Sequence, residues 1–139
     1  MKKEEVYVIL VIDDDRMHQF LMGRIFCKIS SYKLLFSYKP EDIWTYLSLV
    51  NAIDLVIVEP FLKETNGFDL ISKLRFKLKD TPILALTIGA MNDEKKMCLN
   101  SGCDYFLSKP FSIEQLRILV KQILKSERKK FGDKKQKSD

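Results

Sequence analysis

The fold is decided by one stretch in the middle of the chain, Ile53-Asp54-Leu55-Val56-Ile57-Val58-Glu59. Its apolar run, Leu55–Val58, does not alternate with polar residues, which is typical of a strand buried on both faces of a parallel sheet. Four further runs of this character lie at Val6–Ile12, Lys33–Ser37, Ile83–Leu86 and Tyr105–Leu107. Because the segments between them are long enough for helical crossovers, we expect an α/β fold. Its core would be a five-stranded parallel sheet of (βα)5 type, doubly wound and flavodoxin-like.

The segments between the apolar runs carry signals for helix ends. Asp15 and Asn66 are suited to cap the first and third helices, and Ser112 with Gln115 forms a capping box before the fifth. The fourth helix is expected over Asn92–Ser101. The apolar stripes predicted to be buried are Met17, Phe20, Leu21 and Ile25 in the first helix, Ile43, Leu47 and Val50 in the second, Phe68, Leu70, Ile71 and Leu74 in the third, and Leu116, Val120, Ile123 and Leu124 in the fifth.

Composition describes an ordinary globular chain. Its 139 residues are 46% hydrophobic and 31% charged, which suits one domain with a core of its own. The longest apolar stretch, Val6–Ile12, is too short to span a bilayer, and the first residues lack the apolar segment of a signal peptide. Three cysteines show no metal-ligand spacing, so we expect reduced, mostly buried thiols in a cytoplasmic protein without membrane contact.

The net charge of +5 is concentrated at the end of the chain, because residues 121–139 hold eight Lys or Arg against three acids. We expect a domain over residues 1–126, followed at 127–139 by a basic tail that is disordered or begins a linker. A basic tail attracts polyanions, but only Phe131 in it could stack on a base. Nucleic-acid binding is therefore not expected of this chain alone.

Charged and hydroxyl side chains follow the predicted strands. Asp13 and Asp14 follow the first, Glu59 the third, Thr87 the fourth and Lys109 the fifth. Such residues meet at the carboxyl edge of a parallel sheet. Clustered carboxylates are costly without a cation, and oxygen ligands suit Mg²⁺. A lysine and a hydroxyl beside such a metal would hold an anion, which fits phosphoryl transfer by positioning and electrostatics.

The ordered set resembles the receiver domain of two-component response regulators. Four features carry the resemblance: the acidic opening Val11-Ile12-Asp13-Asp14-Asp15, the gap from Glu59 to Gly67, the segment Leu84-Ala85-Leu86-Thr87, and the stretch Gly102-Cys103-Asp104-Tyr105-Phe106-Leu107-Ser108-Lys109-Pro110-Phe111. It covers residues 5–126 and implies the receiver fold.

The resemblance also implies roles for individual residues. Glu59 stands at the phosphoacceptor position. With Asp14 as the main ligand and Asp13 as its support, Glu59 would complete a weak or vestigial Mg²⁺ site. Thr87 would follow the phosphoryl group and Lys109 would pair with it across a cis bond to Pro110. Phe106 is at the aromatic switch position, which turns inward when the threonine moves.

The departures from the family pattern concern the acceptor. Glu59 replaces an aspartate and carries its carboxylate further out by about one C–C bond, while a misplacement of about 1 Å can cost a hundredfold in rate. Lys63 stands where the family usually has proline. Ile88 stands where the family has a small residue and is expected to narrow access for a phosphodonor. Glu59 could imitate a phosphorylated aspartate, or it could form a fixed ion pair with Lys109 in a scaffold without a switch.

The favoured interpretation is a receiver-like signalling module, not an enzyme, that acts by protein–protein contact without phosphorylation or with a constitutive bias. Its partner would bind a surface that includes Lys95, Lys96, Asp104 and Arg117; the sensor kinase or output protein stays unnamed, and a homodimer stays open. The alternatives are an ordinary phosphorelay receiver, the amino-terminal part of a DNA-binding regulator, and a small flavodoxin-like enzyme. His18 lacks the partners that a phosphorelay or metal role would need, so we interpret it as a surface or half-buried helix residue.

Overall fold

The central layer is a parallel sheet in the order β2-β1-β3-β4-β5. The computed structural model describes residues 5–50, 52–88 and 92–137. Its strands are β1 (Tyr7–Ile12), β2 (Tyr32–Ser37), β3 (Leu55–Val58), β4 (Ile83–Thr87) and β5 (Tyr105–Ser108). The expected five-stranded parallel sheet is confirmed, and each predicted strand boundary lies within one residue of the observed one.

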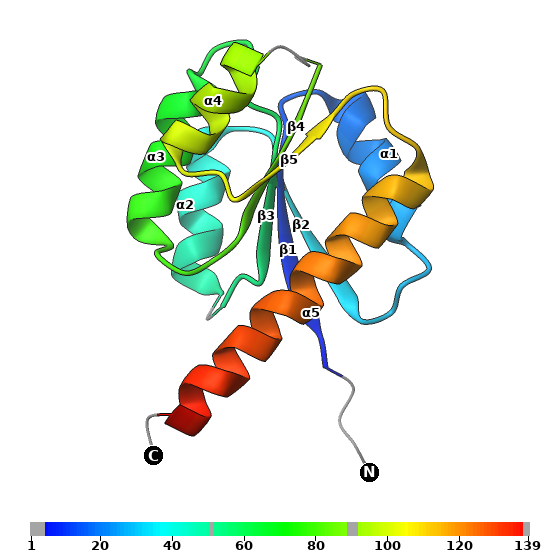
Figure 1. Ribbon diagram of the computed structural model, residues 1–139. Coiled ribbons are helices and arrows are strands. Elements are labelled where there is room, and N and C mark those ends of the chain that lie inside the picture. Colours follow the sequence, from blue (N-terminus) through cyan, green and yellow to red (C-terminus); the bar gives the residue numbers. More distant parts are fainter. Residues whose placement is uncertain (1–4, 51, 89–91, 138–139) are drawn as a thin grey trace.

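Helices cover both faces of the sheet (Figure 1). One face carries α1 (Arg16–Phe26) and α5 (Ile113–Lys137), and the other carries α2 (Pro40–Leu49), α3 (Gly67–Lys77) and α4 (Asn92–Ser101). Alternate residues of β1 point to opposite layers: Ile9 and Val11 face α1 and α5, whereas Leu10 and Ile12 face α2 and α3. This arrangement is the doubly wound architecture that the sequence predicts.

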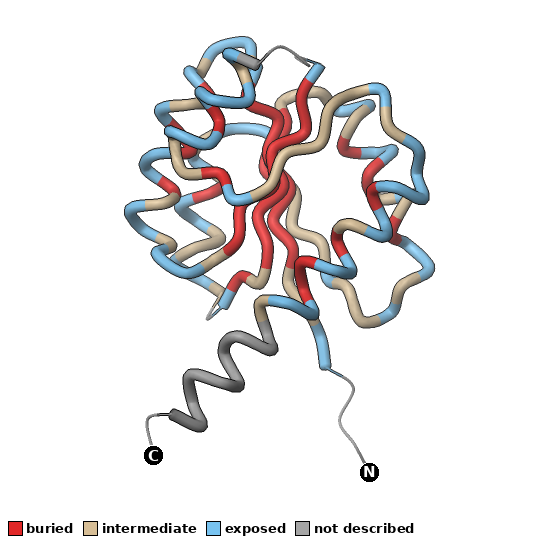
Figure 2. The backbone as a smooth tube through the Cα atoms, viewed as in Figure 1, coloured by how far each residue is buried: buried red, intermediate tan, exposed pale blue. Residues whose placement is uncertain are grey.

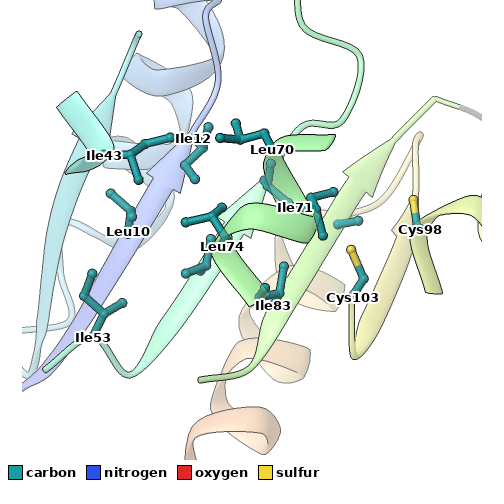
Figure 3. Packing of buried hydrophobic residues seen from close by; sticks show 13 residues of the cluster. Leu10, Ile12, Ile43, Ile53, Leu70, Ile71, Leu74, Ile83, Cys98 and Cys103 are labelled. Carbon is teal, nitrogen blue, oxygen red and sulfur yellow. The ribbon is translucent and has the colours of Figure 1, made fainter. Parts of the chain in front are cut away.

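The core forms two clusters, one on each face of the sheet, with the strands buried between them (Figure 2). Figure 3 shows the cluster under α2, α3 and α4, to which Ile71, Leu74 and Ile83 belong together with Cys98 and Cys103. The predicted stripes of α2, α3 and α5 are confirmed, because their residues lie in these clusters or pack against them.

The first helix turns a different face to the core than its sequence predicts. Met17, Phe20 and Leu21 are exposed, and the buried residues of α1 are Gln19, Met22 and Phe26. Apolar residues occur all around α1, so periodicity alone does not fix its rotation. The rotation of α1 is instead fixed by hydrogen bonds to the segments around it, because the Gln19 amide donates to the backbone carbonyls of Val11, Asp13 and Ser37 at 3.1 Å each. A buried NH2 group needs such acceptors, and this requirement favours the observed buried face.

The helix ends follow the predicted caps. Asp15 accepts the N–H groups of Met17 and His18, and Asn66 accepts those of Phe68 and Asp69. The expected capping box of Ser112 and Gln115 is present at the start of α5. Helix α4 is followed by Gly102, whose φ of +123° is a conformation that side-chain-bearing residues rarely adopt.

Helix α5 continues to Lys137, so residues 127–137 are helical in the structure, and the expectation of a separate basic tail or linker at 127–139 stays a prediction. The sequence there is rich in Lys, Arg, Glu and Gln, which are good helix formers, and the one glycine costs only about 1 kcal/mol. The domain boundary at residue 126 stays a prediction, and residues 138–139 lie outside the described part. Among the described residues, no helix is long and apolar enough to cross a membrane.

Candidate functional site

Backbone hydrogen bonds join the carboxyl ends of neighbouring strands. The N–H of Glu59 donates to the carbonyl of Ile12 at 3.0 Å, and the N–H of Lys109 donates to that of Thr87 at 2.8 Å. Asp13, Glu59 and Thr87 are all buried. The sheet therefore fixes the backbone from which these side chains extend and brings their strand ends to one edge.

Glu59 and Lys109 form an ion pair. Lys109 Nζ lies 2.8 Å from Glu59 Oε2, and the N–H of Phe61 donates to Glu59 Oε1 at 3.2 Å. Only 8% of Glu59 is exposed, so its charge is largely removed from water and depends on these two donors. The bond from Lys109 to Pro110 is cis, as the resemblance implies.

The loop after Glu59 is held close to the start of α3. A Cβ atom on Gly67 would lie only 1.8 Å from the carbonyl oxygen of Pro60, so no larger residue fits without movement of the loop. Phe61 packs edge-to-face on Phe68 with ring centroids 5.8 Å apart. These contacts set the direction in which Glu59 leaves the sheet.

Asp14 is engaged by the same loop. The backbone N–H of Lys63 donates to Asp14 Oδ2 at 2.6 Å. This contact comes from the main chain, so the sequence gives no direct signal for it. The Lys63 side chain is exposed.

His18 is a half-buried helix residue, as the sequence predicts, and it contacts two acidic side chains. Its Nδ1 lies 2.8 Å from Asp13 Oδ2, and its Nε2 lies 3.7 Å from Asp15 Oδ2. His18 is the third residue of α1, and a side chain at this position folds back over the cap, as in a capping box. The position three residues after Asp15 was therefore the available signal. The backbone N–H of His18, followed by that of Met17, lowers the pKa of Asp15 below its usual value.

The acidic residues do not fit the Mg²⁺ site that the resemblance implies. Among the described residues, no three His, Cys, Asp or Glu side chains are grouped so that they could hold a metal ion. Asp13, Asp14 and Glu59 instead accept hydrogen bonds from His18, the Lys63 backbone and Lys109. Mg²⁺ requires near-octahedral oxygen ligands at short range, which this arrangement does not offer.

Thr87, Phe106 and Ile88 lie at different depths. Thr87 is fully buried, and Phe106 is partly buried against the core cluster under α3 and α4. Ile88 is 73% exposed, and the expectation that it narrows access for a phosphodonor stays a prediction. It directly follows the last residue of β4 and extends into solvent there.

The four residues of the predicted partner surface are all exposed but differ in their contacts within the chain, and the surface stays a prediction. Lys95 and Lys96 are exposed on α4. Asp104, in contrast, pairs with Arg75 of α3, and its Oδ2 also accepts the N–H of Ile83 at 2.9 Å. Arg117 donates to the carbonyl of Ile25 in α1 at 2.8 and 3.0 Å. Its side chain is therefore directed toward α1, which lies on the other face of the sheet from α4.

Arg75 is a residue of the scaffold that the sequence did not indicate. Its guanidinium donates to the carbonyls of Gly102 at 3.0 Å, Leu78 at 3.1 Å and Thr81 at 2.8 Å, besides its pair with Asp104. These contacts join the end of α3 to the loop between α4 and β5.

Comparison with known proteins gives one consistent family. The model of the response regulator receiver domain matches residues 9–121. The chain is 29% identical over 103 residues to the response regulator GtcR of Aneurinibacillus migulanus, covering 74% of this chain and 42% of that protein. It is 36% identical over 72 residues to the transcriptional regulatory protein CiaR of Streptococcus pneumoniae, covering 52% of this chain and 32% of that protein. The chain thus spans less than half the length of these relatives.

Solved structures show the same fold. A two-component response regulator from Clostridium difficile aligns with a TM-score of 0.76 at 28% identity, covering 86% of this chain and 96% of that one. A CheY-like receiver domain protein from Methanospirillum hungatei aligns with a TM-score of 0.81 at 19% identity, covering 91% of this chain and 99% of that one.

Proposed function

The chain belongs to the response regulator receiver domain family, and from this premise we propose that it is a two-component signalling module regulated without phosphorylation. The observation that carries the proposal is the ion pair between Glu59 and Lys109, 2.8 Å apart. Lys109 occupies the position that pairs with a phosphoryl group in the family, and here it already has an anion. The pair gives the pocket a permanent negative charge opposite the lysine.

The ion pair fits both a scaffold without a switch and a constitutive bias toward the signalling conformation, and the bias is the effect proposed here. The proposal is supported by the burial of Thr87 and by the partly buried Phe106, which packs against the core. The imitation is incomplete, because a carboxylate carries one negative charge and a phosphoryl group carries between about 1.5 and 2. The module would act by protein contact, with a sensor kinase or an output protein as partner and with no catalysis of its own.

A second candidate is the receiver part of a longer transcriptional regulator. It is favoured by the relatives, of which one is described as a transcriptional regulatory protein and is matched over only 32% of its length. A continuous reading frame that encodes a DNA-binding domain after residue 139 would support this candidate.

The test of the first proposal is exposure to acetyl phosphate with Mg²⁺, followed by the intact mass of the protein. We expect no stable adduct on the wild type. A substantial population heavier by one phosphoryl group, and absent in Glu59→Gln, would contradict the proposal and favour an ordinary phosphorelay receiver.

The bias itself needs a positive readout. In Glu59→Gln, backbone amide resonances of Thr87, Phe106 and Lys109 should shift, because the charge opposite Lys109 is lost. Glu64→Gln is the matched control, since Glu64 is exposed in the same loop and should leave these resonances in place. Equal spectra for Glu59→Gln and the wild type would mean that Glu59 biases nothing.

A further inference from the structure

The acidic residues Asp13, Asp14 and Glu59 lie at the carboxyl edge of the sheet. His18 contacts Asp13 there, and the family resemblance assigns no role to it. We infer that His18 competes with divalent cations for Asp13 and so weakens their binding beside Asp13, Asp14 and Glu59. The inference concerns the β1–α1 loop and does not depend on the state of Glu59.

Both oxygens of Asp13 already have donors. His18 Nδ1 lies 2.8 Å from Oδ2, and the N–H of Asp15 donates to Oδ1 at 2.9 Å. A carboxylate only accepts, so Nδ1 carries the hydrogen in this contact. The Asp13 side chain is 11% exposed whereas that of His18 is 43% exposed, which places the ring on the solvent side of the carboxylate.

The ring is held in place by the start of α1. The backbone N–H of His18 donates to Asp15 Oδ1 at 3.3 Å, and the next residue, Gln19, is anchored to three carbonyls. A cation that displaces the ring must therefore break the charge-assisted hydrogen bond between His18 and Asp13. Helix α1 is anchored and does not move with the ring.

A cation at Asp13 must compete with this arrangement. Mg²⁺ loses its own water reluctantly and needs oxygen ligands in near-ideal geometry. It would have to displace His18 from Oδ2 and accept ligands that are already hydrogen-bonded. Replacing His18 should therefore strengthen Mg²⁺ binding at Asp13. If His18 were itself a metal ligand, its replacement would weaken Mg²⁺ binding.

The experiment is a calorimetric titration with Mg²⁺ at constant pH of the wild type, His18→Ala and His18→Leu. We expect the affinity of the variants to rise about tenfold, the value of one charge-assisted hydrogen bond. His18→Leu keeps a bulky side chain without a donor and serves if His18→Ala folds poorly. Met17→Ala is the matched control, because Met17 is exposed on the same turn and donates to Asp15 only through its backbone N–H.

A gain in either His18 variant that is absent in Met17→Ala supports the inference. Affinity that is equal to or below that of the wild type in both variants, or an equal gain in the control, overturns it. His18 is the only histidine in the chain, so its ring resonances give a second readout. They should move on Mg²⁺ saturation of the wild type as the ring leaves Asp13, and unchanged ring resonances at saturation would also overturn the inference.

Discussion

The Lys109 ammonium lies 2.8 Å from Glu59 Oε2, so two residues fifty positions apart form one charge pair at the carboxyl edge of the sheet. The pair links the end of β3 to the end of β5 across β4. A quarter of the Lys109 side chain is exposed, compared with 9% of the Glu59 side chain. Loss of the lysine would therefore leave a mostly buried carboxylate whose one remaining donor among the described residues is the Phe61 N–H.

We predict that Lys109→Met lowers the free energy of unfolding by about 2 kcal/mol, below the value for a fully buried pair because Lys109 is partly exposed. Urea denaturation measures it. Lys63→Met, which removes an exposed lysine near the same site, should change stability by less than about 0.5 kcal/mol. The double variant Glu59→Gln/Lys109→Met should recover part of the loss, and equal stability of Lys109→Met and the wild type would refute the energetic role of the pair.

We predict that Glu59→Asp restores some phosphorylation by acetyl phosphate, because the shorter side chain brings the carboxylate back by about one bond length. The double variant Glu59→Asp/Ile88→Ala tests whether Ile88 limits the access of the phosphodonor to residue 59. Ile88 is largely exposed, so its effect should be smaller than that of residue 59. Phosphoryl incorporation by intact mass is the measurement, and no incorporation in either variant would show that the pocket was lost for other reasons.

The fold followed from the sequence because its signals are local. Uninterrupted apolar runs gave the strands, and Asp15, Asn66 and Ser112 gave the helix starts. The rotation of α1 was not predictable from periodicity, because it depends on the hydrogen bonds of Gln19 to three separate segments.

The site was predictable only in part. The position of Glu59 opposite Lys109 follows from strand order, which the family resemblance supplies. The contact of Asp14 is with a backbone N–H, and that of His18 depends on the direction of a side chain in the first helical turn. The Asp14 contact has no residue pattern of its own, and the only signal for the His18 contact is its place three residues after Asp15.

We predict that Arg75→Ala destabilises the protein by about 3 kcal/mol, because several carbonyls and the Asp104 carboxylate lose their donor together. Arg75→Lys should recover less than half, since one ammonium cannot reach acceptors arranged around a guanidinium. Lys77→Ala, an exposed change on the same helix, is the control. Thermal unfolding that is alike in Arg75→Ala and Lys77→Ala would show that these hydrogen bonds contribute little.

The last prediction concerns the three thiols, of which Cys27 is exposed and Cys98 and Cys103 are buried. Burial raises the pKa of Cys103 to about 12, and burial also raises that of Cys98. At pH 8, iodoacetamide should therefore add one group to the folded protein, at Cys27, and none to folded Cys27→Ser. Unfolded chains should take up the reagent at every cysteine.

The same shift makes stability fall in alkali. The unfolded Cys103 thiol has a pKa near its ordinary value of 9.0, so above that pH the unfolded chain loses a proton that the folded chain keeps. Stability from this group is complete below pH 9 and declines as the pH rises toward 12. Cys103→Ala should flatten the decline, measured by urea denaturation between pH 8 and pH 10.5. Native labelling of more than one cysteine, or an unchanged alkaline decline in Cys103→Ala, would contradict the buried, protonated state of this thiol.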